Sequence, residues 1–173
     1  KPEVLSAAFA INEGAEGALD KNGKPIALQI QAGEKVYQDF ALEATDVGGH
    51  SSHPTKNNPI ARLSIALAKL NAYNFPIALN PVTRSYFEAE AKLSEAKVAA
   101  DINAVLQSPP DEAAAERLWA INPNWNAMLR TTCIAPQSEG GHDPNEWPPP
   151  EKATVNRRTR PRMPCRQVPA GRP

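Results

Sequence analysis

The stretch VYQDFALEAT, residues 36–45, decides the fold of this chain. Its apolar residues Val36, Phe40, Leu42 and Ala44 stand at even positions, with a tyrosine and acidic residues at the odd positions between them. Successive side chains of a β-strand point to opposite faces of a sheet. The alternation therefore predicts a half-buried strand, with one face turned toward a core. Upstream of it, the Asn-Gly pair at residues 22–23 predicts a β-hairpin, whose second strand carries the alternating residues Ile26, Leu28 and Ile30.

A helix is predicted after this strand and the polar loop that follows it. Asn58 suits the N-cap, and Pro59 suits the first helical position. The apolar stripe expected on this helix is Ile60, Leu63, Leu67 and Leu70. Residues 81–130 favour two or three further short helices, one starting at Asp111, and residues 131–135 and 153–156 favour strands. The order predicts an α+β fold, an antiparallel sheet with helices packed on one face.

Composition excludes several classes of protein. The chain has 173 residues, a formal net charge of zero, 41% hydrophobic and 22% charged residues, as in a globular domain. No apolar run is long enough to span a membrane, so no membrane partner is expected. The two cysteines form no CxxC pair and are too few for a disulfide scaffold. Nucleic acid is not an expected partner, because the basic, proline-rich tail at residues 159–173 lacks aromatic residues for base stacking.

Two short motifs contain residue types that bind metals or stabilise charge. Glu13 follows an apolar run and is flanked by small residues, so its carboxylate is either a zinc ligand or simply solvated. His50 and His53 lie three apart in GGHSSH, residues 48–53. They suit a two-histidine metal site, a neutral imidazole that donates to an oxyanion, or two exposed loop histidines.

Two later motifs also have more than one interpretation. The stretch GGHDPN, residues 140–145, fits a plain turn between strands and ends at Asn145. Arg157 and Arg158 are either surface charges or a clamp for a substrate carboxylate, which a guanidinium binds through two hydrogen bonds.

In their order along the chain, these motifs resemble the co-catalytic zinc peptidases of metallopeptidase family twenty. That family includes aminoacylase, acetylornithine deacetylase, glutamate carboxypeptidase and Gly-Xaa carboxypeptidase. The resemblance covers about residues 1–158 and is strongest to the bacterial branch similar to yeast carboxypeptidase S. The motifs that carry it are NEG at 12–14, the Asn-Gly pair at 22–23, GGHSS at 48–52, NAMLRTTC at 126–133, GGH at 140–142, NEWP at 145–148 and VNRR at 155–158.

The resemblance implies a role for four residues. Glu13 matches a carboxylate that binds one zinc of a pair, and His50 matches a lid histidine that stabilises the oxyanion in the partner subunit's active site. Asn145 matches a lid asparagine that contacts substrate, and Arg158 matches an arginine that grips the substrate's terminal carboxylate. The family's other metal ligands and its general-base glutamate have no counterpart in this sequence.

The resemblance also implies a domain organisation. Residues 1–34 correspond to the C-terminal remnant of the first part of the α/β zinc catalytic domain. Residues 35–158 correspond to an incomplete ferredoxin-like lid, or dimerisation, domain with a helical insertion at about 80–130. Residues 159–173 form an irregular tail.

The chain is therefore expected to be a fragment of a zinc exopeptidase or N-acyl-amino-acid hydrolase that acts on peptides or N-acyl amino acids. The parent enzyme would hold two zinc ions and form a homodimer through the lid. The fragment alone is expected to be inactive and to bind no zinc stably, because Glu13 is a single ligand. The alternative is a non-catalytic dimerisation or binding module with no hydrolytic role.

Overall fold

A computed structural model describes residues 16–56, 58–141, 143–147 and 150–159. The chain divides into two compact units, residues 1–34 and 35–173. Both helices and antiparallel strands are present, which confirms the predicted α+β class. Among the described residues, no helix has the length and apolar character needed to cross a bilayer.

A β-hairpin forms the described part of the first unit. Its strands are β1 (Gly17–Leu19) and β2 (Pro25–Leu28), which pair antiparallel. Gly23 turns the chain with a φ of 79°, which only glycine adopts without strain. The Asp20 carboxylate accepts two backbone N–H groups of the same turn, at 2.8 and 2.9 Å. The Asn-Gly pair therefore forms the predicted hairpin, although the second strand ends before Ile30.

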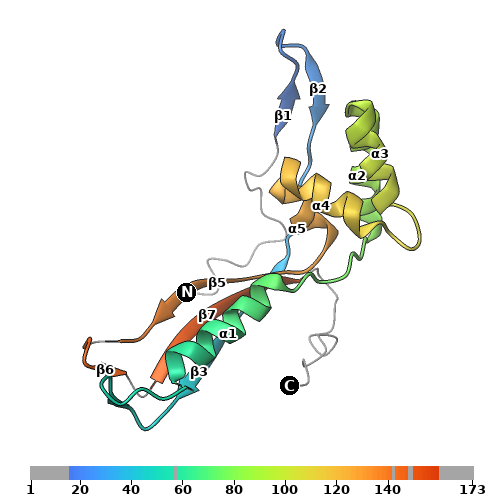
Figure 1. The fold of residues 1–173 in the computed structure, drawn as a ribbon. Helices are drawn as coiled ribbons and strands as arrows, with labels where there is room; N and C mark the ends of the chain where they lie inside the picture. Colours follow the sequence, from blue (N-terminus) through green and yellow to red (C-terminus); the bar gives the residue numbers. More distant parts are fainter. Residues whose placement is uncertain (1–15, 57, 142, 148–149, 160–173) are drawn as a thin grey trace, which may run out of the picture. The chain divides into compact units, whose positions relative to one another are not determined.

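A three-stranded antiparallel sheet is the frame of the second unit (Figure 1). Its strand order is β3 (Val36–Thr45), β7 (Pro150–Thr159) and β5 (Thr132–Glu139). The strand predicted from the alternation at residues 36–45 is confirmed, and the two later strands are longer than predicted. Among the described residues, β3 and β5 each have one edge without a strand partner.

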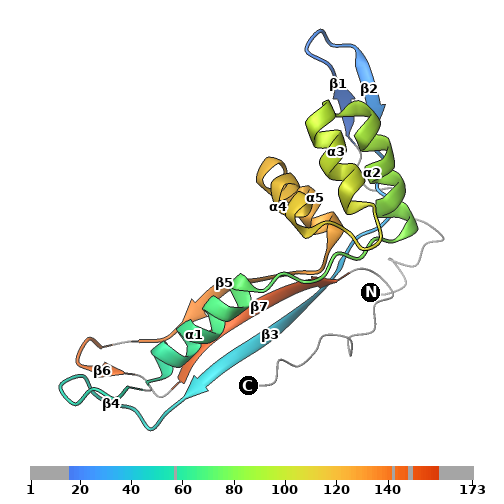
Figure 2. The same ribbon diagram turned by 45° about the vertical axis from the view of Figure 1, so that its right-hand side comes forward.

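Helix α1 (Pro59–Ala72) lies along one face of this sheet (Figures 1 and 2). The Asn58 side chain accepts the Ala61 N–H at 2.9 Å, so the predicted N-cap is confirmed. The inward stripe runs through Pro59 and Leu63, which are both buried. The prediction was wrong for Ile60, which is 47% exposed. Consecutive helical residues are turned by about 100°, so Ile60 points aside once Pro59 faces the sheet.

The insertion contains four helices, not the two or three predicted. These are α2 (Pro81–Leu93), α3 (Ala96–Val105), α4 (Glu112–Ile121) and α5 (Pro123–Leu129). The prediction gave too few helices because the breaks between neighbouring helices are short, and the sequence pattern does not separate them. Ser94 ends α2, and Asn122 both ends α4 and caps α5.

The insertion has a hydrophobic core of its own. Its fully or almost fully buried members come from all four helices and include two large aromatic residues. They are Phe87, Ile102, Val105, Ala114, Ala115, Leu118, Trp125 and Leu129. Burial of this apolar surface is the main favourable contribution to the folding of the insertion.

Arg130 joins the two ends of the insertion. Its side chain is only 2% exposed and donates hydrogen bonds to the Phe75 carbonyl at 3.0 Å and to the Glu112 carboxylate at 2.9 Å. The Lys35 ammonium donates to the Arg130 carbonyl at 2.7 Å. The chain thus enters and leaves the insertion at one point, next to the start of β3.

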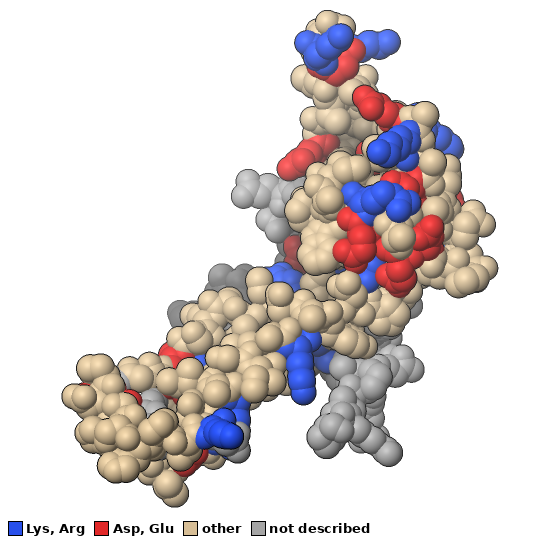
Figure 3. Space-filling model, in the orientation of Figure 1, with Lys and Arg blue, Asp and Glu red and all other residues tan. Residues whose placement is uncertain are grey.

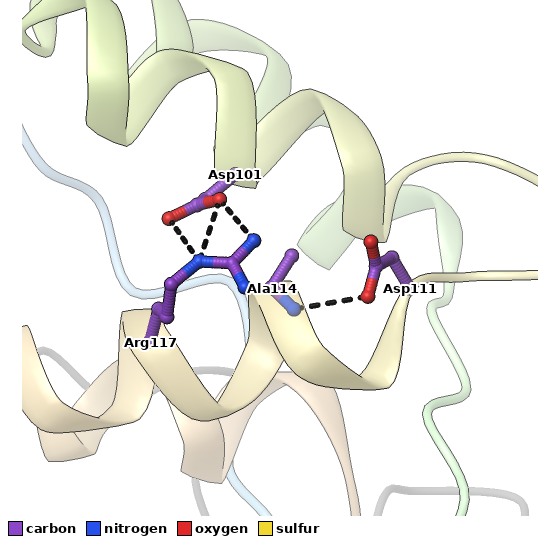
Figure 4. A network of polar contacts seen from close by, with 4 residues as sticks. All are labelled: Asp101, Asp111, Ala114 and Arg117. Carbon is purple, nitrogen blue, oxygen red and sulfur yellow. Dashed lines mark hydrogen bonds and ion pairs between the residues drawn. The ribbon is translucent and has the colours of Figure 1, made fainter.

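A charged pair connects α3 and α4 (Figure 4). The Arg117 guanidinium donates through Nε and Nη2 to the Asp101 carboxylate, with N–O distances of 2.6 to 3.1 Å. At the start of α4, the Asp111 carboxylate accepts the Ala114 N–H at 3.0 Å and caps the helix. Hydrogen bonds from Arg117 lower the pKa of Asp101, and burial opposes that shift without reversing it.

This lowered pKa predicts a loss of stability in acid. The folded chain holds Asp101 ionised more strongly than the unfolded chain does, so protons favour unfolding as the pH falls below about 4. The contribution is fully present above that pH and is lost progressively below it. Thermal unfolding measured from pH 6 downward should therefore show a steeper decline for the natural chain than for Asp101→Asn. Parallel curves for the two proteins would contradict this role.

Candidate functional site

A small two-stranded ribbon beyond the end of the main sheet contains His50, and Asn145 directly precedes its second strand. β4 (Gly49–His50) pairs antiparallel with β6 (Glu146–Trp147), and His50 lies opposite Glu146. Next to this pair, the Ser51 N–H donates to the Asn145 carbonyl at 2.7 Å. Figure 2 shows β4 and β6 side by side. The structure therefore places the backbone of the His50–Ser51 segment next to the backbone of Asn145, although the two segments are far apart in sequence.

The register of the main sheet explains this proximity. The last residue of β3, Thr45, lies opposite the first residue of β7, Pro150. The chain that follows β3 and the chain that precedes β7 must therefore leave the sheet at the same end. Gly48 and Gly141 turn these two segments with φ values of 78° and 66°. The interpretation of residues 140–145 as a turn between strands is thus correct for the part that the structure describes.

His50 is exposed, and its ring is held from one side. Its Nδ1 accepts the backbone N–H of Ser52 at 3.2 Å, and the Ser52 hydroxyl lies 2.8 Å from the same nitrogen. A backbone N–H can only donate, so Nδ1 of the neutral ring is the acceptor and the proton lies on Nε2. The ring therefore presents an N–H donor, which is the group that stabilises an oxyanion.

The two loop histidines do not form a metal site with other described residues. Their ring centroids lie 6.4 Å apart, and the Nδ1 atom of each ring contacts the Ser52 hydroxyl. In the part of the chain that the structure describes, no three histidine, cysteine or acidic side chains gather as metal ligands would. Glu13, the predicted zinc ligand, lies outside the described residues.

Arg158 lies toward the opposite end of β7 from His50 and Asn145. It is exposed and opposite Tyr37 in the sheet, with its guanidinium 5.7 Å from the Tyr37 ring centroid. Arg157 is instead buried and stacks 5.1 Å from the ring centroid of Phe40. Arg158 is thus the member of the pair that can meet a solvent-borne carboxylate. A strand rises about 3.3 Å per residue, so Arg158 lies roughly 25 Å from Pro150 along β7.

Sequence reasoning missed two residues near this ribbon. Ser52 contacts His50, but no pattern in GGHSSH distinguishes it from Ser51. Glu151 is 8% exposed at the start of β7, and its carboxylate lies so close to Gly140 that a Cβ atom added there would displace it. Alternation along β7 was the available signal, because Ala153, Val155 and Glu151 share one face.

The charges on the surface are mixed. On the face drawn in Figure 3, acidic and basic side chains alternate over the insertion and no single basic patch stands out. In the ribbon, the acidic residue Glu146 lies opposite His50.

Comparison with curated proteins identifies relatives of the chain. It is 31% identical over 165 residues to N-fatty-acyl-amino acid synthase/hydrolase PM20D1 of Mus musculus, a match that covers 93% of this chain and 32% of the relative. The Homo sapiens protein is 30% identical over the same length, and the Xenopus tropicalis protein is 27% identical over 166 residues. The chain is related to these enzymes. At a coarse level, this relationship agrees with the resemblance to metallopeptidase family twenty.

The chain spans about a third of the length of the curated relatives it matches. No family model matches the chain. No solved structure matches it at a significant level.

Gly48 is predicted to determine where His50 lies. Alanine at a positive φ costs about 1 kcal/mol or more, so Gly48→Ala should shift the chain that leads into β4 and move the His50 ring signals in an NMR spectrum. Gly23→Ala is the matched control, because Gly23 has nearly the same φ, 79° against 78°, but lies in the hairpin of the other unit. Equal effects of both variants on the His50 signals would refute this prediction.

Proposed function

We propose that this chain is the lid segment of a zinc-dependent amidohydrolase that acts on N-acyl amino acids or related peptides. The observation that carries the proposal is the Nε2–H donor of His50, in a loop whose backbone is hydrogen-bonded to Asn145. The relatives support it, because their name describes the synthesis and hydrolysis of N-fatty-acyl amino acids.

The proposed reaction needs a donor at one oxygen of the substrate. Hydrolysis of an amide passes through a tetrahedral intermediate, in which the former carbonyl oxygen becomes negatively charged. A preorganised N–H group at that oxygen lowers the barrier by about 3–4 kcal/mol, judged from the loss of single oxyanion donors in other enzymes. His50 would supply this group, and the Asn145 amide would hydrogen-bond the substrate next to it.

Arg158 would bind the carboxylate of the same class of substrate. In an N-acyl amino acid, the amide oxygen and the carboxylate lie within about 5 Å of each other. Along β7, Arg158 lies roughly 25 Å from the end of the sheet that leads to His50. One substrate therefore cannot contact both residues of one chain, which supports a homodimer in which His50 and Asn145 serve the partner subunit's substrate.

Zinc would supply the activated water of this reaction when bound. The described residues do not form a binding set for it, so the two zinc ions implied by the resemblance would be held elsewhere, with Glu13 as one ligand. The part of the chain that the structure describes would bind and orient the substrate and stabilise the oxyanion.

The first test of this function is His50→Ala in the full-length enzyme. Loss of the oxyanion donor should lower turnover by about a hundredfold or more, while zinc content and the unfolding temperature stay unchanged. Steady-state kinetics and metal analysis measure these quantities. If the variant instead loses zinc, His50 is a metal ligand and the proposed role is wrong.

Mixing two inactive variants tests whether His50 acts across the dimer. A heterodimer of His50→Ala with a variant that lacks the catalytic base contains one complete site, so part of the activity should return. Heterodimer formation should be verified with two different affinity tags. Verified heterodimers without activity would favour the alternative, a lid that serves only dimerisation.

Arg158→Ala tests the proposed carboxylate clamp. The variant should raise KM for an N-acyl amino acid with a free carboxylate, and should have little effect on the same compound with an amide cap, because the amide lacks the charge that the guanidinium binds. The natural enzyme should prefer the free acid. An equal loss on both substrates would show that Arg158 is not a carboxylate clamp.

A further inference from the structure

Ser52 lies between the two histidines of the GGHSSH loop. Its hydroxyl oxygen is 2.8 Å from Nδ1 of His50 and 3.0 Å from Nδ1 of His53. We infer that Ser52 and His53 are positioning residues that hold the His50 ring with its proton on Nε2. This inference rests on the proposed function, because it concerns the group that would donate to the oxyanion.

The positions of the protons in this cluster follow from one fixed donor. The Ser52 backbone N–H points at Nδ1 of His50, at 3.2 Å, so that nitrogen accepts. The Ser52 hydroxyl, close to the same unprotonated nitrogen, must then donate its own proton to it, since two lone pairs would otherwise face each other. With its proton used in this way, the hydroxyl oxygen accepts from His53, whose proton lies on Nδ1.

The cluster therefore assigns opposite tautomers to the two histidines. In His50 the proton is on Nε2 and the ring can donate outward. In His53 the proton is on Nδ1 and is used inside the cluster. Two unconnected histidines in a solvated loop have no physical reason to differ in this way, so the difference is a signature of the arrangement.

Backbone hydrogen bonds hold the residues on both sides of Ser52. The Ser51 N–H donates to the Asn145 carbonyl at 2.7 Å, and the His53 N–H donates to the His50 carbonyl at 2.9 Å. Because His50 is exposed, packing does not restrict rotation of its ring. The contacts with Ser52 supply the orientation that packing does not, and a donor contributes to catalysis only when it is oriented before the reaction.

The first test is the tautomeric state of each histidine in this chain. NMR correlation of ring nitrogens with ring carbons, at about pH 8.5 where histidines are neutral, reports which nitrogen carries the proton. His50→Gln and His53→Gln assign the signals. We expect Nε2–H for His50 and Nδ1–H for His53. The same tautomer in both rings would overturn the inference.

Ser52→Ala and Ser51→Ala form a matched pair for the second test. Ser52→Ala removes the bridging hydroxyl, so His53 should lose its preference for Nδ1–H. Ser51→Ala retains the backbone bond to Asn145, so both tautomers should remain. In the full-length enzyme, Ser52→Ala should lower kcat by about tenfold with little change in KM. Ser52→Thr, which keeps a hydroxyl, should restore much of the loss.

The two levels of the proposal fail in different ways. If His50→Ala lowers kcat but Ser52→Ala behaves like Ser51→Ala, the positioning role is overturned and the proposed function stands. If His50→Ala leaves kcat unchanged, the proposed function is overturned, and the tautomers alone then decide whether the proton arrangement is correct.

Discussion

The pairing of β7 with strands on both sides is the constraint on which the rest of the second unit depends. β3 and β7 pair along their whole lengths, from Val36 opposite Thr159 to Thr45 opposite Pro150. This register fixes which ends of the strands coincide, and so it decides which connecting segments meet. It also buries every second side chain of β7 beneath α1 or beside its neighbours, so that a shift by one residue would expose the buried set.

Such a pairing joins segments more than 100 residues apart and needs a way to limit the entropy of loop closure. The helical insertion meets this need because it folds around its own core. Arg130 and Phe75 hold its exit next to its entry, and Lys35 connects that point to the start of β3. Because its two ends lie together, the long insertion adds little to the entropy cost of closing the loop between β3 and β7. This explains how the sheet can accept an insertion of four helices without a change in strand register.

The features that could be predicted from the sequence are those set by neighbours in the chain. Alternation predicted β3, Asn58 and Pro59 predicted the start of α1, and an Asn-Gly pair predicted the hairpin, because each depends on local backbone preferences. The number of helices in the insertion was harder to predict. A single residue, Asn122, ends one helix and begins the next, and periodicity alone does not detect so short a break.

The arrangement of the candidate site could be predicted from the sequence only in part. Motif order indicated His50, Asn145 and Arg158, but their distances depend on the sheet register, which no local pattern reveals. The role of Ser52 depends on the rotamer of one imidazole ring and on the direction of one N–H bond. The sequence alone does not show which of the two adjacent serines, Ser51 or Ser52, contacts the His50 ring. Glu13 stays a prediction, because it lies outside the described residues.

If the second unit is the proposed lid, the separation along β7 also limits what its movement can achieve. A hinge between domains changes the distance from a lid residue to a catalytic domain, but it leaves distances within the lid almost unchanged, because a paired strand does not contract. A span of roughly 25 Å therefore persists between the two ends of β7 in any open or closed state. If His50 and Arg158 both act on substrates of this size, each lid must contribute to two active sites. Assembly of the dimer, and not closure alone, would then complete each site.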